Sequence, residues 1–251
     1  MIELTESCIK SIKHYFNRTN GKVAVIGISG GKDSTVTAAL CVQALGKENV
    51  LGVLMPNGEQ CDIRDSYKIC NFLDIEYLEI NIHKACYDIE SAIDYLVRVK
   101  KPSMTTKFNQ VSKQAEINLQ PRIRMATLYA VAQSIEGGRV INTSNKCEAY
   151  VGWGTLWGDT VGDFSPLGNL LISEIVKIGD DLGLPDDLVH KVPSDGLTGK
   201  SDEENLGVTY NSIENVILND ITKVPYPHYR KIDDMHTKSA FKREMINLPK
   251  F

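Results

Sequence analysis

The sequence predicts an α/β fold in which a doubly wound, mostly parallel sheet carries helices on both faces. Three observations predict it. Short apolar, β-branched runs recur over the first 145 residues, helical periodicity fills the stretches between them, and glycine or proline marks most changes of pattern. Parallel strands need crossover connections of this kind, usually helices.

The elements follow in chain order. Residues 3–17 place apolar side chains at helical spacing and predict a helix. We expect strands at 22–28, 49–55, 75–82 and 139–145 and helices at 33–45, 62–73, 84–100 and 109–136. A glycine-rich loop over 150–170 precedes a helix at 173–182, and the chain from 211 onward is expected to be helical before an irregular, basic end.

These elements predict a single domain over residues 1–251. Its expected parts are an N-terminal helix (1–20), an α/β core (22–190), a polar loop that we expect to be mobile (193–205), and a C-terminal helical segment with its tail (206–251).

Composition narrows the class of protein. The chain is 42% hydrophobic and 24% charged with a net charge of −4, which argues against wholesale disorder and against binding nucleic acid mainly through its phosphates. The six cysteines form no C-x-x-C pair, and no segment approaches ~18 uninterrupted apolar residues. We therefore expect a cytoplasmic protein with reduced thiols that binds neither nucleic acid nor a membrane.

The stretch "VIGISGGKDSTV" (25–36) predicts a phosphate-binding turn between a strand and a helix. It lacks the first glycine and the last hydroxyl of a Walker A loop, and the spacing of a G-x-G-x-x-G fingerprint is also absent. Instead the pattern is S-G-G-x-D-S. The residues expected to contact the nucleotide are Gly27, Ile28, Ser29, Gly30, Gly31, Lys32, Asp33 and Ser34.

The residue types explain the chemistry. Gly30 and Gly31 allow backbone N–H groups to approach an anion, and Ser29 and Ser34 add hydroxyl donors. A carboxylate at Asp33 would repel phosphate unless it held Mg²⁺. The alternative is an ordinary turn with Asp33 or Ser34 as a helix N-cap. A turn that holds the β- and γ-phosphates would make pyrophosphate the leaving group and expose the α-phosphorus to attack.

The S-G-G-x-D-S pattern is similar to that of the ATP pyrophosphatase family. Four further segments resemble ammonia-dependent NAD synthetases: "MPNGEQCDIRDS" (55–66), "NLQPRIRM" (118–125), "NTSNKCEAYVGWGTLWGDTVGDFSPL" (142–167) and "VPSDGLTGKSDEENLGVTY" (192–210). The resemblance implies a Rossmann-like fold of the adenine nucleotide alpha-hydrolase kind. It also implies a homodimer that joins ammonia to deamido-NAD through an acyl-adenylate, giving NAD, AMP and pyrophosphate.

By matched position, the resemblance implies roles for particular residues. Asp33 and Glu148 would hold Mg²⁺ on the ATP, and Asp159 would orient or deprotonate ammonium, which makes these three the catalytic candidates. Thr143 and Ser194 would contact ATP. The residues implied for deamido-NAD are Arg122, Asp163 and Lys242.

Plainer interpretations stay open for these side chains. Arg122 and Arg124 could form a solvated helix face, and Glu148 could be a surface acid. Asp159 and Asp163 could cap glycine turns. The other residues with a structural alternative are Trp153 and Trp157, as core packing, and Cys147, as a buried thiol.

The sequence departs from the family pattern where three cations are replaced by Leu156, Ile172 and Phe241, although Lys146 or Lys200 could substitute for them in space. Two rival functions therefore remain. One is another ATP pyrophosphatase, such as a tRNA-thiolating enzyme, which the lack of cysteine pairs and of a basic surface disfavours. The other is a catalytically impaired nucleotide-binding relative. Free ammonia is the expected nitrogen source, unless a separate glutaminase subunit supplies it.

Overall fold

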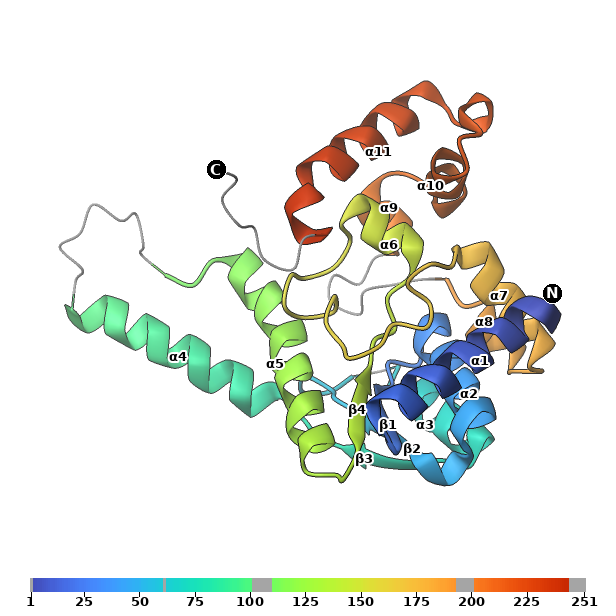
Figure 1. Ribbon diagram of the computed structural model, residues 1–251. Helices are drawn as coiled ribbons and strands as arrows, with labels where there is room; N and C mark the ends of the chain where they lie inside the picture. Colours follow the sequence, from blue (N-terminus) through green and yellow to red (C-terminus); the bar gives the residue numbers. More distant parts are fainter. Residues whose placement is uncertain (1, 61, 101–109, 193–200, 244–251) are drawn as a thin grey trace, which may run out of the picture.

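The computed structural model describes residues 2–60, 62–100, 110–192 and 201–243. Its strands form one parallel sheet in the order β3-β2-β1-β4 (Figure 1). The strands are β1 (Val23–Gly27), β2 (Val50–Leu54), β3 (Glu76–Glu79) and β4 (Gly138–Ile141). In the central register Val25 of β1 lies beside Leu51 of β2 and Val140 of β4. The parallel α/β sheet predicted from the sequence is confirmed.

Helices connect and flank these strands. They are α1 (Ile2–Thr19), α2 (Lys32–Leu45), α3 (Ile63–Leu73), α4 (His83–Lys100), α5 (Lys113–Gln133), α6 (Lys146–Val151), α7 (Ile172–Asp181), α8 (Asp186–Val189), α9 (Asp202–Leu206), α10 (Tyr210–Ile217) and α11 (Tyr226–Lys238). Short 3₁₀ turns occur at Lys47–Asn49, Ile221–Lys223 and Ala240–Arg243. No helix of the described residues is both long and apolar enough to cross a lipid bilayer.

Strand β1 sends its side chains alternately into two cores, as the period of an extended chain requires. Ala24 and Ile26 pack with α1, α2, α3, α7 and α8, whereas Val25 packs with α5 on the other face. In Figure 1 the first group of helices lies to the right of the sheet, and α4 and α5 lie to the left. Helices therefore cover both faces, and the doubly wound arrangement is confirmed.

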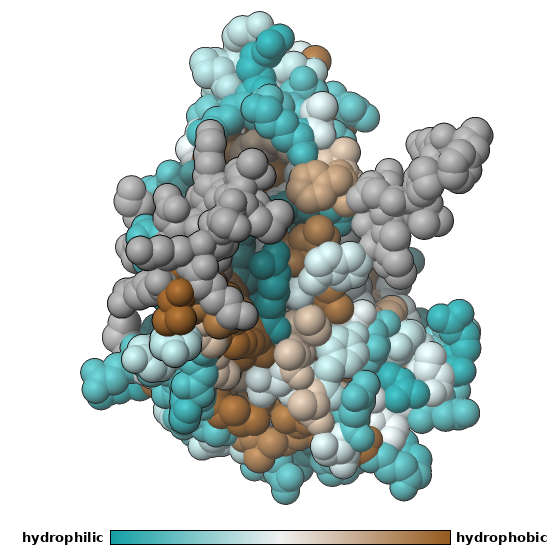
Figure 2. All heavy atoms as spheres, turned by 90° about the vertical axis from the view of Figure 1, so that its left-hand side faces the viewer, coloured by the Kyte–Doolittle hydropathy of each residue, from teal (hydrophilic) through white to brown (hydrophobic). Residues whose placement is uncertain are grey.

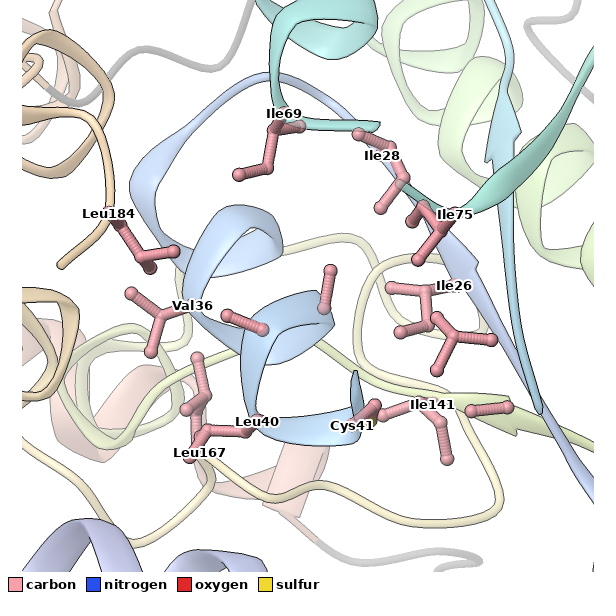
Figure 3. Packing of buried hydrophobic residues seen from close by; sticks show 14 of the residues in the cluster. Ile26, Ile28, Val36, Leu40, Cys41, Ile69, Ile75, Ile141, Leu167 and Leu184 are labelled. Atoms are coloured by element: carbon pink, nitrogen blue, oxygen red, sulfur yellow. The ribbon is translucent and has the colours of Figure 1, made fainter. Parts of the chain in front are cut away.

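Helix α2 lies at the centre of the first core. Figure 3 shows Cys41 beside Ile141 of the sheet, while Val36 lies near Leu184 and Leu40 near Leu167 on the other side of the helix. These side chains are almost fully buried, and burial of each large apolar one stabilises the fold by about 1.5–3 kcal/mol. This packing fixes the position at which α2 begins, directly after the turn that follows β1.

A separate apolar cluster lies at the C-terminal end of the molecule. Cys147 and Val151 of α6 pack there against Ile213 of α10 and Ile232 of α11. In Figure 1 these helices stand above the sheet, and α6 lies between them and the strands. The short helix α6 therefore joins the C-terminal cluster to the rest of the fold.

Several predicted boundaries are wrong, among them the end of β4 and both ends of α5. Strand β4 ends at Ile141, four residues early, because Asn142 turns away: its Nδ2 donates to the carbonyl oxygens of Asp159 and Val161. The last helix before β4 begins at Lys113, where the Ser112 side chain caps it by accepting from the Ala115 N–H. That helix also ends at Gln133 rather than 136.

The predicted loops have mixed outcomes. Residues 152–171 form irregular turns, as expected, and one parallel bridge joins Phe164 to Ile141 at the edge of β4. A mobile loop was predicted at 193–205. Its residues 193–200 lie outside the described residues. The loop prediction is wrong for 202–205, which begin α9 under a capping box made by Ser201 and Glu204.

The turn between β1 and α2 requires glycine at Gly30. Its φ of +75° is strained for a side-chain-bearing residue, and a Cβ there would lie 2.7 Å from Cβ of Asp65 and 2.9 Å from N of Ser66. Gly183 offers a matched comparison, because its φ is +65° but nothing lies within 4 Å of the Cβ position.

We expect Gly30→Ala to lower the free energy of unfolding by about 2–4 kcal/mol, because it adds overpacking against α3 to the backbone strain. Gly183→Ala should cost only about 1 kcal/mol, from strain alone. Urea denaturation followed by circular dichroism measures both. Equal losses would show that the contact with α3 does not constrain the turn.

Candidate active site

A cavity of about 330 Å³ opens at the carboxyl ends of β1, β2 and β4. This is where parallel α/β sheets bind ligands. Of the eight residues predicted at 27–34, all except Gly30 line it, as do Thr143, Glu148 and Asp159. Ser194 lies outside the described residues. The structure thus gathers most of the predicted nucleotide-binding residues around one hollow.

The two serines of the S-G-G-x-D-S turn brace it from within. The hydroxyls of Ser29 and Ser34 lie 3.0 Å apart, and Ser34 Oγ donates to the Gly31 carbonyl at 3.0 Å. The Gly31 N–H donates to Ser29 Oγ at 3.2 Å. The turn is therefore held in shape before any ligand arrives.

The first turn of α2 has no side-chain cap. Gly31 is its N-cap residue, and neither Asp33 nor Ser34 caps the helix. The plain N-cap interpretation of the motif is therefore excluded. Uncapped amides at the positive end of a helix form a binding site for an anion.

Asp33 and Glu148 bring two carboxylates together beside this turn. Asp33 Oδ2 accepts from Lys32 Nζ at 3.1 Å, while Asp33 Oδ1 is buried without any hydrogen-bond partner. Glu148 is held by a capping box, in which its Oε2 accepts from the Asn145 N–H. Burial, and then the charge of Asp33, raises the pKa of Glu148 to about 8, although Lys32 acts in the opposite direction.

This pair suits a divalent cation. Among the described residues no three His, Cys, Asp or Glu side chains gather as a ligand set, so the protein would supply two carboxylates and leave the other positions to phosphate oxygens and water. Mg²⁺ is usually bound in this way. The buried, unpaired oxygen of Asp33 and the repulsion at Glu148 are the observations that fit it.

Asp202 and Tyr210 extend this polar cluster, and the sequence prediction missed them. The Tyr210 hydroxyl donates to Asp202 Oδ2 at 2.9 Å, and Lys32 Nζ lies 5.8 Å from the centre of the Tyr210 ring. Burial and the charge of Glu148 raise the pKa of Tyr210, which keeps it a neutral donor. The S-D-E pattern after the polar loop was the signal available in the sequence.

The glycine-rich loop brings Asp159 to the cavity, where it also caps a turn. Asp159 Oδ2 accepts from the Thr155 N–H at 2.9 Å. Asp163 does not line the cavity: its Oδ2 accepts from the Val140 N–H of β4 and its Oδ1 from the Tyr129 hydroxyl. Both aspartates thus stabilise the loop, and a direct substrate contact by Asp163 stays a prediction.

Arg122 and Lys242 also lie outside the lining of the cavity. Arg122 Nε donates to the Leu156 carbonyl at 3.2 Å. Lys242 Nζ donates to the carbonyls of Gly152 and Gly154, both at 2.9 Å, and burial lowers its pKa. Each therefore fastens the glycine-rich loop, and their contact with substrate stays a prediction.

Two cations of the cavity were not predicted as site residues. Arg124 is half-buried and lines the cavity rather than forming a solvated helix face, and Lys191 lines it with an ion pair to Asp65 at 2.6 Å. The sequence carried a signal for Arg124, because it lies one helical turn from Pro121 and Leu128, which line the same wall.

The structure also bears on the plainer interpretations of Cys147 and Trp153 and on the residues that replace the family's cations. Cys147 is a buried thiol whose pKa burial raises to about 12, as the plainer interpretation held. Trp153 both packs on the C-terminal cluster and lines the cavity. Of the residues that replace cations, Ile172 packs on the same cluster, whereas Phe241 is 49% exposed. Lys200 lies outside the described residues.

The fold and the turn define the class of a Rossmann-like α/β protein with an anion-binding turn at the carboxyl edge of its sheet. Comparisons with known proteins identify the family. A model described as NAD synthase matches residues 4–246. A Thermococcus sibiricus protein named NH(3)-dependent NAD(+) synthetase is 35% identical over 242 residues, which is 96% of this chain and 85% of the relative.

Two solved structures are similar along almost the whole chain. An NMN synthetase from Francisella tularensis matches with a TM-score of 0.85 and 31% identity over 99% of this chain and 98% of its own. An NH3-dependent NAD synthetase from Campylobacter jejuni, in complex with nitrate, matches with a TM-score of 0.77 and 27% identity over the same shares. The chain belongs to the NAD synthase family. The matches support ATP-dependent amidation of deamido-NAD to NAD, by an amide-forming ligase, as the sequence predicted.

We expect Glu148→Gln to stabilise the metal-free protein at pH 8. The pKa of Glu148 is raised from 4.5 to about 8, so its contribution to stability is present below pH 4.5 and is lost as the pH rises to about 8. Glutamine keeps the capping acceptor without the charge. Thermal unfolding with EDTA should show a gain of about 4 kcal/mol at pH 8 and little gain at pH 4.5. A loss at pH 8 would contradict the repulsion.

Proposed function

We propose that this chain activates the nicotinate carboxylate of deamido-NAD with ATP and then amidates it with ammonia. A single observation carries the proposal: an uncapped, glycine-built turn lies beside a carboxylate pair that repels itself. The turn suits the terminal phosphates of ATP. The carboxylates suit the Mg²⁺ that would accompany them.

The proposed reaction has two steps. A carboxylate oxygen attacks the α-phosphorus of ATP, the bond from that phosphorus to the bridging oxygen breaks, and pyrophosphate leaves. Ammonia then attacks the acyl carbon, AMP leaves with the bond electrons, and one proton is lost. In this scheme Asp159, which lies at the cavity wall, takes the ammonium proton or orients the ammonia.

The chain's own groups hold ATP in the proposed scheme. The amides of the β1–α2 turn and the first turn of α2 bind the β- and γ-phosphates. Thr143 lines the cavity near the end of β4 and is placed to contact the nucleotide, and Ser194 is proposed for the same role. Asp33 and Glu148 would hold Mg²⁺, which when bound neutralises the polyphosphate and favours the departure of pyrophosphate.

A second candidate acid substrate is nicotinic acid mononucleotide. The match to the Francisella NMN synthetase favours it. Both acids would present the same carboxylate to the same phosphorus, so the chemistry of the site is common to them. They differ in whether an adenosine phosphate extends beyond the reacting end.

We also propose that the chain forms a homodimer through α4. This helix packs against α5, yet Tyr87, Tyr95 and Val99 are each 59–65% exposed. In Figure 1 α4 projects from the body, and Figure 2 shows apolar side chains gathered on the face that carries α4 and α5. An apolar surface of this kind on a projecting helix is typical of an interface between subunits.

We expect the purified chain to convert ATP, Mg²⁺, ammonium and deamido-NAD to NAD, AMP and pyrophosphate. Phosphorus NMR identifies the products, and ADP with orthophosphate would overturn the proposal. Specificity constants for deamido-NAD and for nicotinic acid mononucleotide decide between the two acids.

Asp33→Asn should lower turnover at least 10²-fold, the loss typical of a removed electrostatic contact. Asp234→Asn, which breaks only an exposed ion pair, should not.

The homodimer is tested at α4. We expect sedimentation equilibrium at micromolar concentration to give a dimer, and Tyr95→Glu with Val99→Glu to give a folded monomer, because two charges would have to be buried. Lys13→Glu on the exposed surface of α1 is the control. A monomeric wild-type chain would contradict the proposed interface.

A further inference from the structure

Three cations line the cavity among the described residues, and they differ in their partners. Lys32 Nζ lies 3.1 Å from Asp33 Oδ2, and Lys191 Nζ lies 2.6 Å from Asp65 Oδ2. Arg124 has no carboxylate of the described residues within 4.0 Å, although it is half-buried. Its charge therefore has no partner within the part of the protein that the structure describes.

The Arg124 side chain is nevertheless held in place. Its Nε donates to the carbonyl of Met55, at the end of β2, at 3.1 Å. Neither terminal nitrogen donates to another described residue, and neither is among the fully buried polar atoms. The hydrogen bond fixes the plane of the guanidinium and leaves the paired N–H groups of its outer edge for a ligand.

The charge of Arg124 is only partly compensated by nearby acidic side chains, which favours the binding of an anion. Burial lowers the pKa of Arg124, and Asp159 and Asp62 oppose this from a distance without forming an ion pair. Arginine remains charged in proteins under such conditions. A cation that is partly desolvated and only remotely compensated binds an oxyanion strongly when one enters the cavity.

Arg124 approaches the cavity from α5, whereas the phosphate turn belongs to α2. These helices cover opposite faces of the sheet. An anion on Arg124 is thus held from the opposite side to the phosphates on the turn. The proposed first step brings two anions together, a carboxylate and the α-phosphate, and a cation at their meeting point would offset their repulsion.

We propose that Arg124 binds a substrate oxyanion in a bidentate manner, either the carboxylate of the acid substrate or the α-phosphate that it attacks. The assignment of these two groups rests on the proposed function. The anion-binding role itself rests on the geometry of Arg124. It makes this arginine a catalytic residue, and the fork of its guanidinium is essential to that role.

Variants of Arg124 distinguish anion binding by its side chain from a purely structural role, in which it only hydrogen-bonds the Met55 carbonyl. Arg124→Gln keeps an N–H donor in the side chain, Arg124→Lys keeps the charge without the fork, and Arg124→Ala opens space for added methylguanidine. Arg18→Gln, an exposed substitution at the end of α1, is the control. We expect kcat/KM of Arg124→Gln to fall about 10²–10³-fold, Arg124→Lys to recover little of it, and methylguanidine to restore activity to Arg124→Ala.

Binding measurements identify the anion. Calorimetry with MgATP alone and with deamido-NAD alone should show one affinity reduced at least tenfold in Arg124→Gln. A loss for deamido-NAD assigns the carboxylate, and a loss for MgATP assigns the α-phosphate. Unchanged affinities for both together with kcat/KM within twofold of wild type, or a lowered melting temperature without rescue by methylguanidine, would overturn the role. If the wild-type chain forms no amide, the proposed function fails, while the binding experiments still decide the role of Arg124.

Discussion

The burial of two neighbouring carboxylates, Asp33 and Glu148, is the constraint on which the rest of the site depends. Two carboxylates line one largely buried cavity. Lys32 Nζ donates to Asp33, and its charge also lowers the pKa of Glu148, against the larger effects that raise it. A fold tolerates such an arrangement only when surrounding groups hold it in place. In this chain both acids lie in the first turn of a helix, since Asp33 is the second residue of α2 and Glu148 completes the capping box of α6. The positive ends of two helices thus oppose the repulsion.

The packing explains why these helix ends meet. Helix α2 is fixed by apolar contacts on one face of the sheet, and the turn before it follows from the end of β1. Helix α6 is placed by Asn142 and Asn145, whose amide groups fasten the loop and cap the helix where β4 stops. The charged cleft is therefore a product of apolar packing together with the hydrogen bonds that the Asn142 and Asn145 side chains make.

Much of the fold and part of the site could be predicted from the sequence, and the features that were missed depend on contacts between distant residues. Local pattern predicted the parallel sheet and the residues of the phosphate turn, because strand and turn chemistry depend on near neighbours in the sequence. The end of β4 was missed, because long-range hydrogen bonds of Asn142 decide it. Arg124 and Asp202 were missed for a related reason: their importance depends on what faces them across the cavity. Asp163 and Lys242 have backbone partners that no spacing in the sequence reveals.

The division of the molecule into separate apolar clusters has a consequence for its motions. Helix α6 contributes Cys147 and Val151 to the C-terminal cluster while Glu148 between them faces the cleft. Cooperative opening of α10 and α11 would remove the support of α6 without melting the sheet. Native-state hydrogen exchange should therefore show the amides of α6 exchanging together with those of α10 and α11. The stability of the cleft is then limited by the stability of the C-terminal helices.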